Sequence, residues 1–254
     1  MHRLFYINVK SVVIIQARIG STRLPGKVLK LLAGKPSIHR QIERVKRISS
    51  VSQIVLATSL SDVEKPLCEW MREREKDVLL FRGSEEDVLE RFYQAASQTK
   101  ADVIMRITGD CPLLSPNISG AVLQKFLQSG GAYDYVSNVE QRTYPRGLDT
   151  EVFSMKVLEQ AYKEASSASD REHVTPYIRK VTPPERIGNV ENKKTDDSRY
   201  RWTLDTEEDY RLISAVYDSL YSKKSDFEFE DVLKLFQEKP ELAKLNAHIQ
   251  QKEI

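Results

Sequence analysis

The sequence predicts an α/β protein with a mostly parallel, mixed central sheet and helices on both of its faces. In the first 130 residues, short apolar runs that are rich in β-branched residues alternate with longer stretches whose apolar residues recur at helical spacing. Polar loops follow each apolar run, and turn residues separate it from the next helix. This alternation is typical of parallel strands that are joined by crossover helices.

Four runs of this half are predicted to be strands. Each is short and ends at a polar loop, as expected for a buried strand of a parallel sheet. They are SVVIIQA (11–17), SQIVLATS (52–59), DVLLFRG (77–83) and ADVIMRITGD (101–110). Ligands of such sheets bind beyond the carboxyl ends of the strands, so we expect the loops QARIGSTRLPGK (16–27) and TGD (108–110) to face the same crevice.

Each predicted strand is followed by a predicted helix, at residues 37–48, 62–76, 84–98 and 115–130. Ser84 and Asp87 occupy capping-box positions at the start of the third helix. In the fourth, Ser115 is the expected N-cap, Pro116 the first helical residue and Gly130 the stop signal.

The second half is less regular. Residues 133–155 indicate strand, loop and strand, followed by a helix at 156–166. RYRWTLD (199–205) is predicted to be a strand before a helix with a Thr206–Asp209 capping box, and the tail at 227–246 is helical with a break at Pro240. We therefore predict an N-terminal extension (1–10) and one domain (11–254), with residues 133–200 as an excursion from it.

Composition excludes several classes of protein. Lys plus Arg number 39 against 37 for Asp plus Glu, a balance that argues against a chain that coats nucleic acid. No run of 18 apolar residues is present to span a membrane, and no cleavage site for a signal peptide precedes QAR. The two cysteines, Cys68 and Cys111, are expected to be reduced thiols of a cytoplasmic protein.

The loop QARIGSTRLPGK (16–27) is a candidate phosphate-binding site. Five residues separate Gly20 from Gly26-Lys27 and Val28 follows, so it lacks the spacing and the metal-binding hydroxyl of a Walker P-loop. Arg18, Arg23 and Lys27 nevertheless gather beside Gly20 and Ser21, where backbone amides and cations can hold phosphate oxygens. The alternative is a solvated basic turn.

This loop resembles the N-terminal signature of sugar cytidylyltransferases, which include the CMP-acylneuraminate and CMP-KDO synthetases. The best match is to the spore-coat polysaccharide (SpsF-like) group. Further matches are RGSEEDVLERFYQAA, RITGDCPL, YPRGLDTEVFS, DREHVTPYIR and RWTLDTEEDYRLI, in order from residue 12 to about 215. The resemblance implies a nucleotide-diphospho-sugar transferase fold (Rossmann-like, GT-A type), with the excursion forming a homodimer.

Asp110 and Asp205 are the candidate magnesium ligands. A triphosphate that meets an attacking hydroxyl needs a divalent ion, and Mg²⁺ uses a few carboxylates together with waters and phosphate oxygens. Taken alone, Asp110 suits a turn and Asp205 a helix N-cap equally well. The resemblance favours the metal, since matching aspartates of the family hold catalytic magnesium.

The resemblance also implies a nucleotide site. Arg18 and Lys27 are expected at the β- and γ-phosphates, and with Asp110 they form the predicted catalytic set. Arg23 is expected to share the phosphates with the backbone at Gly20 and Ser21. The other predicted nucleotide contacts are Gln16 and Ala17 near the base or ribose, and Arg82, Gly83 and Ser84 in a loop that closes over the nucleotide or only caps a helix.

The predicted sugar site draws on the second half of the chain. Asp149 and Glu151 alternate along one strand and so share a face. An arginine in this region would hold the carboxylate of an acidic sugar. The candidates are Arg146, Asp149, Glu151, Arg171, His173 and Arg179, with His173 either a base or structural.

The expected reaction is transfer from CTP to an acidic sugar of the nonulosonic type, giving CMP-sugar and pyrophosphate for surface or spore-coat polysaccharide. Three alternatives remain open. A transferase of the same fold could use another base or a sugar phosphate. A glycosyltransferase would need an Asp-x-Asp motif where TGDCP offers one acid, and a non-catalytic nucleotide-binding partner would not need the aspartates and cations that are retained here.

Overall fold

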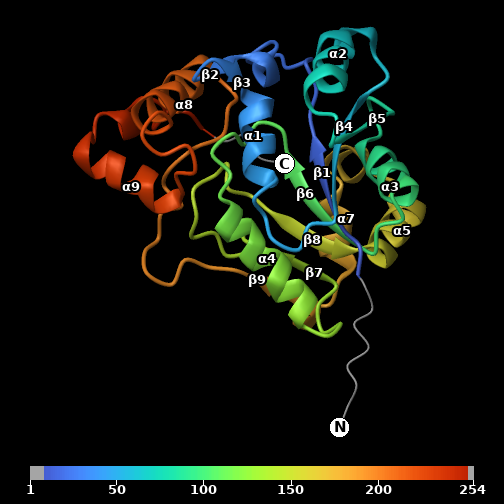
Figure 1. Ribbon diagram of the computed structural model, residues 1–254. Coiled ribbons are helices and arrows are strands. Elements are labelled where there is room, and N and C mark those ends of the chain that lie inside the picture. Colours follow the sequence, from blue (N-terminus) through green and yellow to red (C-terminus); the bar gives the residue numbers. More distant parts are fainter. Residues whose placement is uncertain (1–8, 251–254) are drawn as a thin grey trace.

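A seven-stranded mixed sheet forms the centre of the protein. The computed structural model describes residues 9–250, so the predicted extension (1–10) lies outside the described residues except for Val9 and Lys10. The strand order is β5-β4-β1-β6-β8-β7-β9, with helices on both faces (Figure 1). The predicted α/β fold class is confirmed, while the predicted division into domains stays a prediction.

One half of the sheet is parallel. It comprises β1 (Ser11–Gln16), β4 (Gln53–Ser59), β5 (Leu79–Gly83) and β6 (Val103–Thr108). β1 lies between β4 and β6, and Gln16 is in register with Ala57 and Thr108. The carboxyl ends of these strands therefore lie together at one edge of the sheet, as the sequence predicted.

In the other half, only β8 runs against the direction of the remaining strands of this sheet. β8 (Glu151–Ser154) runs antiparallel to β6, β7 (Tyr135–Ser137) antiparallel to β8, and β9 (Ile187–Asn189) parallel to β7. The predicted strand–loop–strand of the excursion thus continues the main sheet. A separate hairpin, β2 (Leu31–Leu32) and β3 (Lys35–Pro36), follows the first loop.

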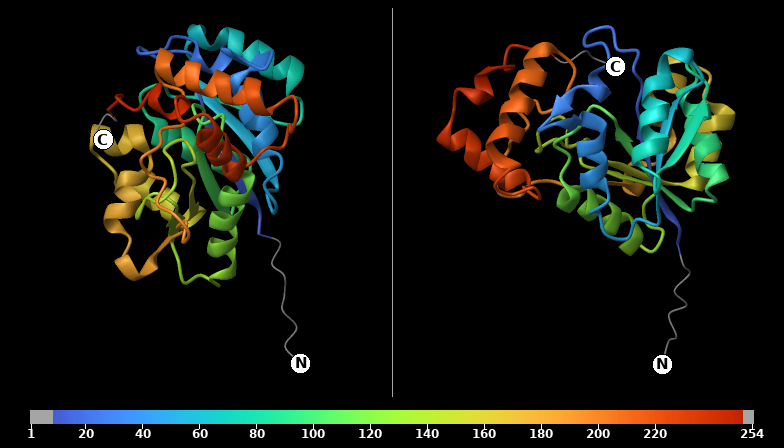
Figure 2. Two further views of the ribbon diagram at one scale, coloured as in Figure 1. Left: turned by 90° about the vertical axis from the view of Figure 1, so that its left-hand side faces the viewer. Right: turned by 45° about the horizontal axis from the view of Figure 1, so that its top comes forward.

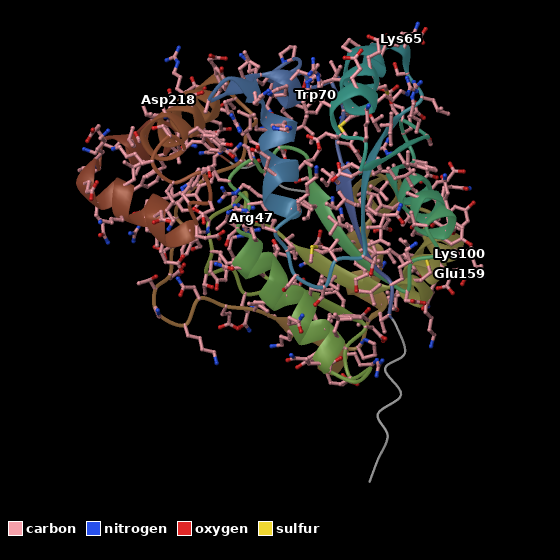
Figure 3. The ribbon with its side chains drawn as sticks, in the orientation of Figure 1. Arg47, Lys65, Trp70, Lys100, Glu159 and Asp218 are labelled. Atoms are coloured by element: carbon pink, nitrogen blue, oxygen red, sulfur yellow. The ribbon has the colours of Figure 1, made fainter. Side chains whose placement is uncertain are left out.

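Helices bury the apolar residues of both faces. α1 (Ser37–Val45), α2 (Lys65–Arg74) and α4 (Pro116–Gln128) pack on the face that contains Val13 and Ile15. The opposite face, with Val12 and Ile14, is covered by α3, α5 and α7. These and the intervening helix are α3 (Val88–Gln98), α5 (Met155–Glu164), α6 (Ala168–His173) and α7 (Thr175–Val181). Charged side chains such as Lys65 and Lys100 lie at the periphery (Figure 3).

A third apolar cluster forms beside the sheet. It packs α8 (Glu207–Leu220) and α9 (Phe229–Glu238) around Trp202 and includes Leu24 and Leu113, which come from the two loops that follow β1 and β6. In Figure 2 these two helices lie together at one end of the molecule. Through Leu24 and Leu113, the cluster therefore anchors both loops. Short 3-10 helices complete the fold: η1 (Lys27–Leu29), η2 (Asp62–Glu64), η3 (Pro184–Arg186) and η4 (Leu242–Lys244). No helix within residues 9–250 is long and apolar enough to cross a membrane.

Helix ends confirm some predictions and correct one. Ser115 caps α4 ahead of Pro116, and Thr206 with Asp209 forms the predicted capping box of α8. The prediction that α3 opens at Ser84 was wrong. Asp87 is the N-cap and accepts a hydrogen bond from the Glu90 amide at 2.8 Å, while the Ser84 hydroxyl accepts one from the Asp87 amide.

The predicted strand at 199–205 was also wrong. Arg146 and Arg201 form only an isolated bridge among the described residues. The Trp202 amide donates to the Arg146 carbonyl at 2.7 Å, but the next hydrogen bond that would extend the bridge into a β-ladder does not form. Gly147 makes this close approach possible. It has φ 99°, and a Cβ there would lie 2.5 Å from the backbone of Trp202.

Gly147→Ala is expected to destabilise the fold by about 3 kcal/mol, since the new methyl meets backbone and the left-handed conformation disfavours a side chain. Gly130→Ala is the matched control. Its φ is also positive, at 61°, but nothing lies within 4 Å of its Cβ position, so about 1 kcal/mol is expected. Urea denaturation measures both, and equal losses would contradict the steric account.

Candidate active site

The loops that follow β1 and β6 meet at the carboxyl edge of the sheet. The Gly109 amide donates to the Gln16 carbonyl at 2.7 Å. A Cβ at Gly109 would lie 2.7 Å from that of Ala17, so only glycine permits this contact. The side chains described next confirm that both loops lie together at this edge, while a crevice that they share stays a prediction.

Lys27 joins two carboxylates from distant parts of the chain. Its Nζ lies 3.0 Å from Asp110 Oδ2 and 2.9 Å from Asp205 Oδ1. Arg23 also pairs with Asp205, on the other carboxylate oxygen. Four of the residues predicted from the sequence, across separations of up to 182 residues, thus form one cluster.

Electrostatics keep Asp110 and Lys27 ionised. Burial alone would raise the pKa of Asp110, but the Lys27 charge lowers it to about 2. Burial likewise opposes the charge of Lys27, yet Asp110 and then Asp205 raise its pKa above the ordinary value of 10.5. Near neutral pH the site therefore holds the ionised Asp110 carboxylate and the Lys27 ammonium group in direct contact.

The backbone holds Asp205 beside Asp110. The Leu204 amide donates to the Asp110 carbonyl at 2.7 Å, and the N-cap of α8 is Thr206. N-capping therefore does not explain Asp205. Instead, Arg201 Nη2 reaches its Oδ2 at 3.4 Å, and Asp209 accepts the Asp205 amide at 3.1 Å. Arg201 was not predicted from the sequence as a functional residue, and Asp209 was predicted only as a capping residue.

The loop from Arg18 to Lys27 combines internal hydrogen bonds with backbone amides that lack an acceptor among the described residues. Ile19 donates to both oxygens of Glu64, at 2.9 and 3.1 Å, and Glu64 is only 1% exposed. Among residues 9–250, the amides of Arg18, Gly20, Thr22 and Arg23 have no protein acceptor, and the Arg18 side chain is exposed. The Ser21 hydroxyl accepts the Leu24 amide at 3.3 Å. The loop is thus braced internally while several donors stay available.

The loop after β5 is occupied by internal contacts. Arg82 donates to the carbonyls of Ser59 and Ser61, both at 3.0 Å. Close packing at Gly83 comes from Arg91, whose Cγ would lie 3.0 Å from a Cβ there. The nucleotide contacts predicted for Arg82, Gly83 and Ser84 remain predictions.

Arg91 is a buried cation that sequence analysis missed, since it looks like an ordinary helix residue. It is 1% exposed and donates to the Ser84 carbonyl at 2.6 Å, and its Nε has no acceptor among the described residues. Burial and then the nearby charge of Arg18 lower its pKa to about 10. An anion between Arg18 and Arg91 would relieve this repulsion.

Most of the predicted sugar contacts have protein partners. Asp149 accepts two hydrogen bonds from Arg142, at 2.6 and 2.9 Å, and Arg179 pairs with Glu140 at 2.5 Å. Glu151 is buried with Arg106 and with the Tyr135 hydroxyl, so it faces the interior. The role predicted for each in sugar binding stays a prediction.

The motif DREHVTPYIR forms α6 and α7. Arg171 pairs with Asp87 and donates to the Tyr162 carbonyl, and thereby ties α6 to the start of α3. His173 ends α6 and is partly exposed. Val174 follows with φ 72°, a strained conformation for a β-branched residue. The sugar-binding roles of Arg171 and His173 are likewise untested.

Arg146 differs from the other candidates. It forms no ion pair within residues 9–250, is partly exposed, and lies near Arg142, Asp149 and Arg201. Burial and then the Arg142 charge lower its pKa. Its charge is therefore the one most in need of an anionic partner.

The carboxylate pair suits a magnesium ion. No cluster of three or more His, Cys, Asp or Glu side chains in the described part of the chain is arranged for a metal. Mg²⁺ needs no such cluster when phosphate oxygens and waters complete its octahedron. Asp110 and Asp205 already share one cation, Lys27, which shows that their oxygens converge.

Comparisons with known proteins agree with this geometry. Residues 12–253 match the sequence profile of the cytidylyltransferases. The chain belongs to this family. It is therefore a nucleotidyltransferase that uses a cytidine nucleotide, as the sequence resemblance implied.

Individual relatives cover nearly the whole cytidylyltransferase. The spore coat polysaccharide biosynthesis protein SpsF of Bacillus subtilis is 33% identical over 91% of this chain and 95% of its own. The structure of a cytidylyltransferase from Leptospira borgpetersenii superposes with a TM-score of 0.87 at 30% identity, over 96% of this chain and 100% of that one. A CMP-KDO synthetase solved with CTP has a TM-score of 0.64 at 20% identity, over 83% and 99% of the chains, and so shares the fold.

A divalent ion that reaches Asp110 and Asp205 competes with the Lys27 ammonium. Lys27→Met is therefore expected to tighten Mn²⁺ binding in the absence of nucleotide by about tenfold or more, since one charge within 4 Å is worth over 1 kcal/mol at an effective dielectric constant of 20. Electron paramagnetic resonance of Mn²⁺ measures this.

Lys30→Met is the control for this experiment, because Lys30 pairs with Glu207 and not with either aspartate. Unchanged Mn²⁺ affinity in Lys27→Met would show that the two carboxylates do not form the metal site.

Proposed function

We propose that this cytidylyltransferase transfers CMP from CTP to a hydroxyl group of a small acidic sugar, giving a CMP-sugar and pyrophosphate. The observation that carries the proposal is the shared contact of Lys27 with Asp110 and Asp205, next to a loop that offers Arg18, Arg23 and free amides. This arrangement supplies cations for a triphosphate and carboxylates for Mg²⁺ at one place.

In the proposed reaction the sugar hydroxyl oxygen attacks the α-phosphorus and releases its proton to solvent, and the bond from that phosphorus to the bridging oxygen of the β-phosphate breaks. Pyrophosphate leaves with that oxygen and its negative charge. Arg18, Arg23 and Lys27 bind the leaving phosphates and offset the charge that develops on them. Mg²⁺, held by Asp110 and Asp205, would supply further neutralisation of phosphate charge. Catalysis rests on positioning and electrostatics rather than on a covalent intermediate.

The loop that contains Arg18 would change its partners when CTP binds. The Lys27 ammonium group contacts the Asp110 and Asp205 carboxylates in this structure. A triphosphate offers it stronger, doubly charged partners, so we expect Lys27 to turn from the aspartates to the phosphates as the metal arrives. Binding of nucleotide and metal would then be coupled.

An acidic acceptor of the nonulosonic type agrees with the unpaired charge of Arg146 at the edge of the site. Several relatives are 3-deoxy-manno-octulosonate cytidylyltransferases, one of them from Escherichia coli at 30% identity over 45% of this chain, and their name supports an acidic sugar as the acceptor. The name of the SpsF relative supports a role in polysaccharide synthesis. We further propose a cytoplasmic role in surface or spore-coat polysaccharide synthesis, as a homodimer formed through residues 133–200.

Pyrophosphate release tests the reaction. With Mg²⁺ and a panel of acidic sugars, release is expected from CTP and not from ATP, GTP or UTP. Asp110→Asn and Lys27→Ala are expected to lower kcat at least about 100-fold, because each removes a charge that acts on the reacting phosphates. The exposed Asp196→Asn is the control. Release from another nucleotide in preference to CTP would sink the proposed cytidylyl transfer.

Arg146→Ala is expected to raise KM for the acidic sugar about 10- to 100-fold, the loss of a charge-assisted contact, with KM for CTP unchanged. Steady-state kinetics with both substrates varied would measure this. Arg199→Ala, which removes an exposed arginine that contacts Tyr200, serves as the control. A rise in KM for CTP instead would place Arg146 at the nucleotide.

A further inference from the structure

The C-terminal segment contacts the residues next to the candidate active site through one buried side chain, that of Asn246. Asn246 is only 2% exposed, although most residues around it are exposed. It follows η4, whose Leu242 and Ala243 pack against the cluster of α8 and α9, so the chain turns back along α8 after α9 (Figure 2). None of the sequence motifs that indicated a function includes this segment.

The amide group of Asn246 uses both of its hydrogens. Nδ2 donates to Asp209 Oδ1 at 2.7 Å and to the Arg201 carbonyl at 2.8 Å. A surface asparagine that only ends a helix would have water as its partner. Here both acceptors are buried and belong to the segment that carries Asp205.

Asp209 in turn fixes the backbone and the cation around Asp205. Its carboxylate is fully buried and accepts the amides of Asp205 and Thr206 at 3.1 and 3.0 Å. It also accepts Arg201 Nε and Nη2, each at 3.0 Å. Arg201 then reaches Asp205 Oδ2. Asp209 and Arg201 thus orient the Asp205 carboxylate together with the two cations of the loop after β1 that also pair with it.

We propose that Asn246 is a positioning residue for Asp205, acting through Asp209 and Arg201. The inference rests on the proposed role of Asp205 as a magnesium ligand. Asn246 itself touches neither Asp205 nor Lys27. By holding Asp209 Oδ1 and the Arg201 carbonyl, it sets the direction in which Arg201 and the 205–206 backbone present the Asp205 oxygens. Removing it leaves the Arg201 carbonyl without its donor and takes from Asp209 Oδ1 one of its donors, while Arg201 Nε still donates to that oxygen, and this loss allows the network to rearrange.

Asn246→Ala and Asn246→Asp test the proposal, with Mn²⁺ binding measured by electron paramagnetic resonance in the presence of CTP and without a sugar. We expect Mn²⁺ binding about tenfold weaker in Asn246→Ala. A larger loss is expected in Asn246→Asp, because its carboxylate faces that of Asp209. The Mg²⁺ concentration for half-maximal activity should rise in the same order, with KM for CTP little changed.

Asn117→Ala and Asn117→Asp are matched controls, since Asn117 is exposed in the first turn of α4. Melting temperatures are recorded for every variant. If the Asn246 variants melt earlier but bind Mn²⁺ as the wild type does, Asn246 is merely structural and the proposal fails. Should Asn246→Asp not fold, Asn246→Ser retains a small donor and is expected to fall between wild type and Asn246→Ala.

Failure of the proposed function gives a different result. In that case the wild type itself would bind no Mn²⁺ in the presence of CTP, or the Asp205→Asn variant would bind Mn²⁺ as tightly as the wild type does. A wild type that loses Mn²⁺ affinity in Asp205→Asn but not in the Asn246 variants keeps the metal site and overturns only the role of Asn246.

Discussion

The contact of one ammonium group with two carboxylates is the interaction on which the site depends. Lys27 comes from the loop after β1, Asp110 from the loop after β6, and Asp205 from the segment before α8. Each charge is largely removed from water, so each needs its partners. The close backbone contacts at Gly109 and Gly147 are consequences of bringing these three segments together.

The sheet explains why these segments meet. Parallel strands place the ends of β1 and β6 side by side, and the apolar cluster around Trp202 holds the third segment against them. Beyond β6, β8 is inserted antiparallel between β6 and β7, and the chain from β7 to β9 completes this side of the sheet. Arg146 belongs to this part of the chain and joins it to the segment of Arg201 by an isolated β-bridge.

Local patterns sufficed for the parts of the molecule that depend on neighbours in sequence. The strand at β1, the caps of α4 and α8, and the pairing of the first loop with Asp110 follow from periodicity and from the rule that parallel strands share a ligand-binding edge. The segment 199–205 was predicted to be a strand because its residues favour one, yet only one bridge forms among the described residues. Glu64, Arg91 and Asn246 gave no local signal, since each becomes important only through tertiary contacts.

The central claim is that nucleotide and metal together take Asp110 and Asp205 away from Lys27. A crystal structure with CTP and Mn²⁺, in which anomalous scattering locates the manganese, tests it most directly. We expect a manganese peak bonded to both aspartates, with Lys27 Nζ in contact with the phosphates. A peak elsewhere, with Lys27 still bridging the two carboxylates, would contradict it.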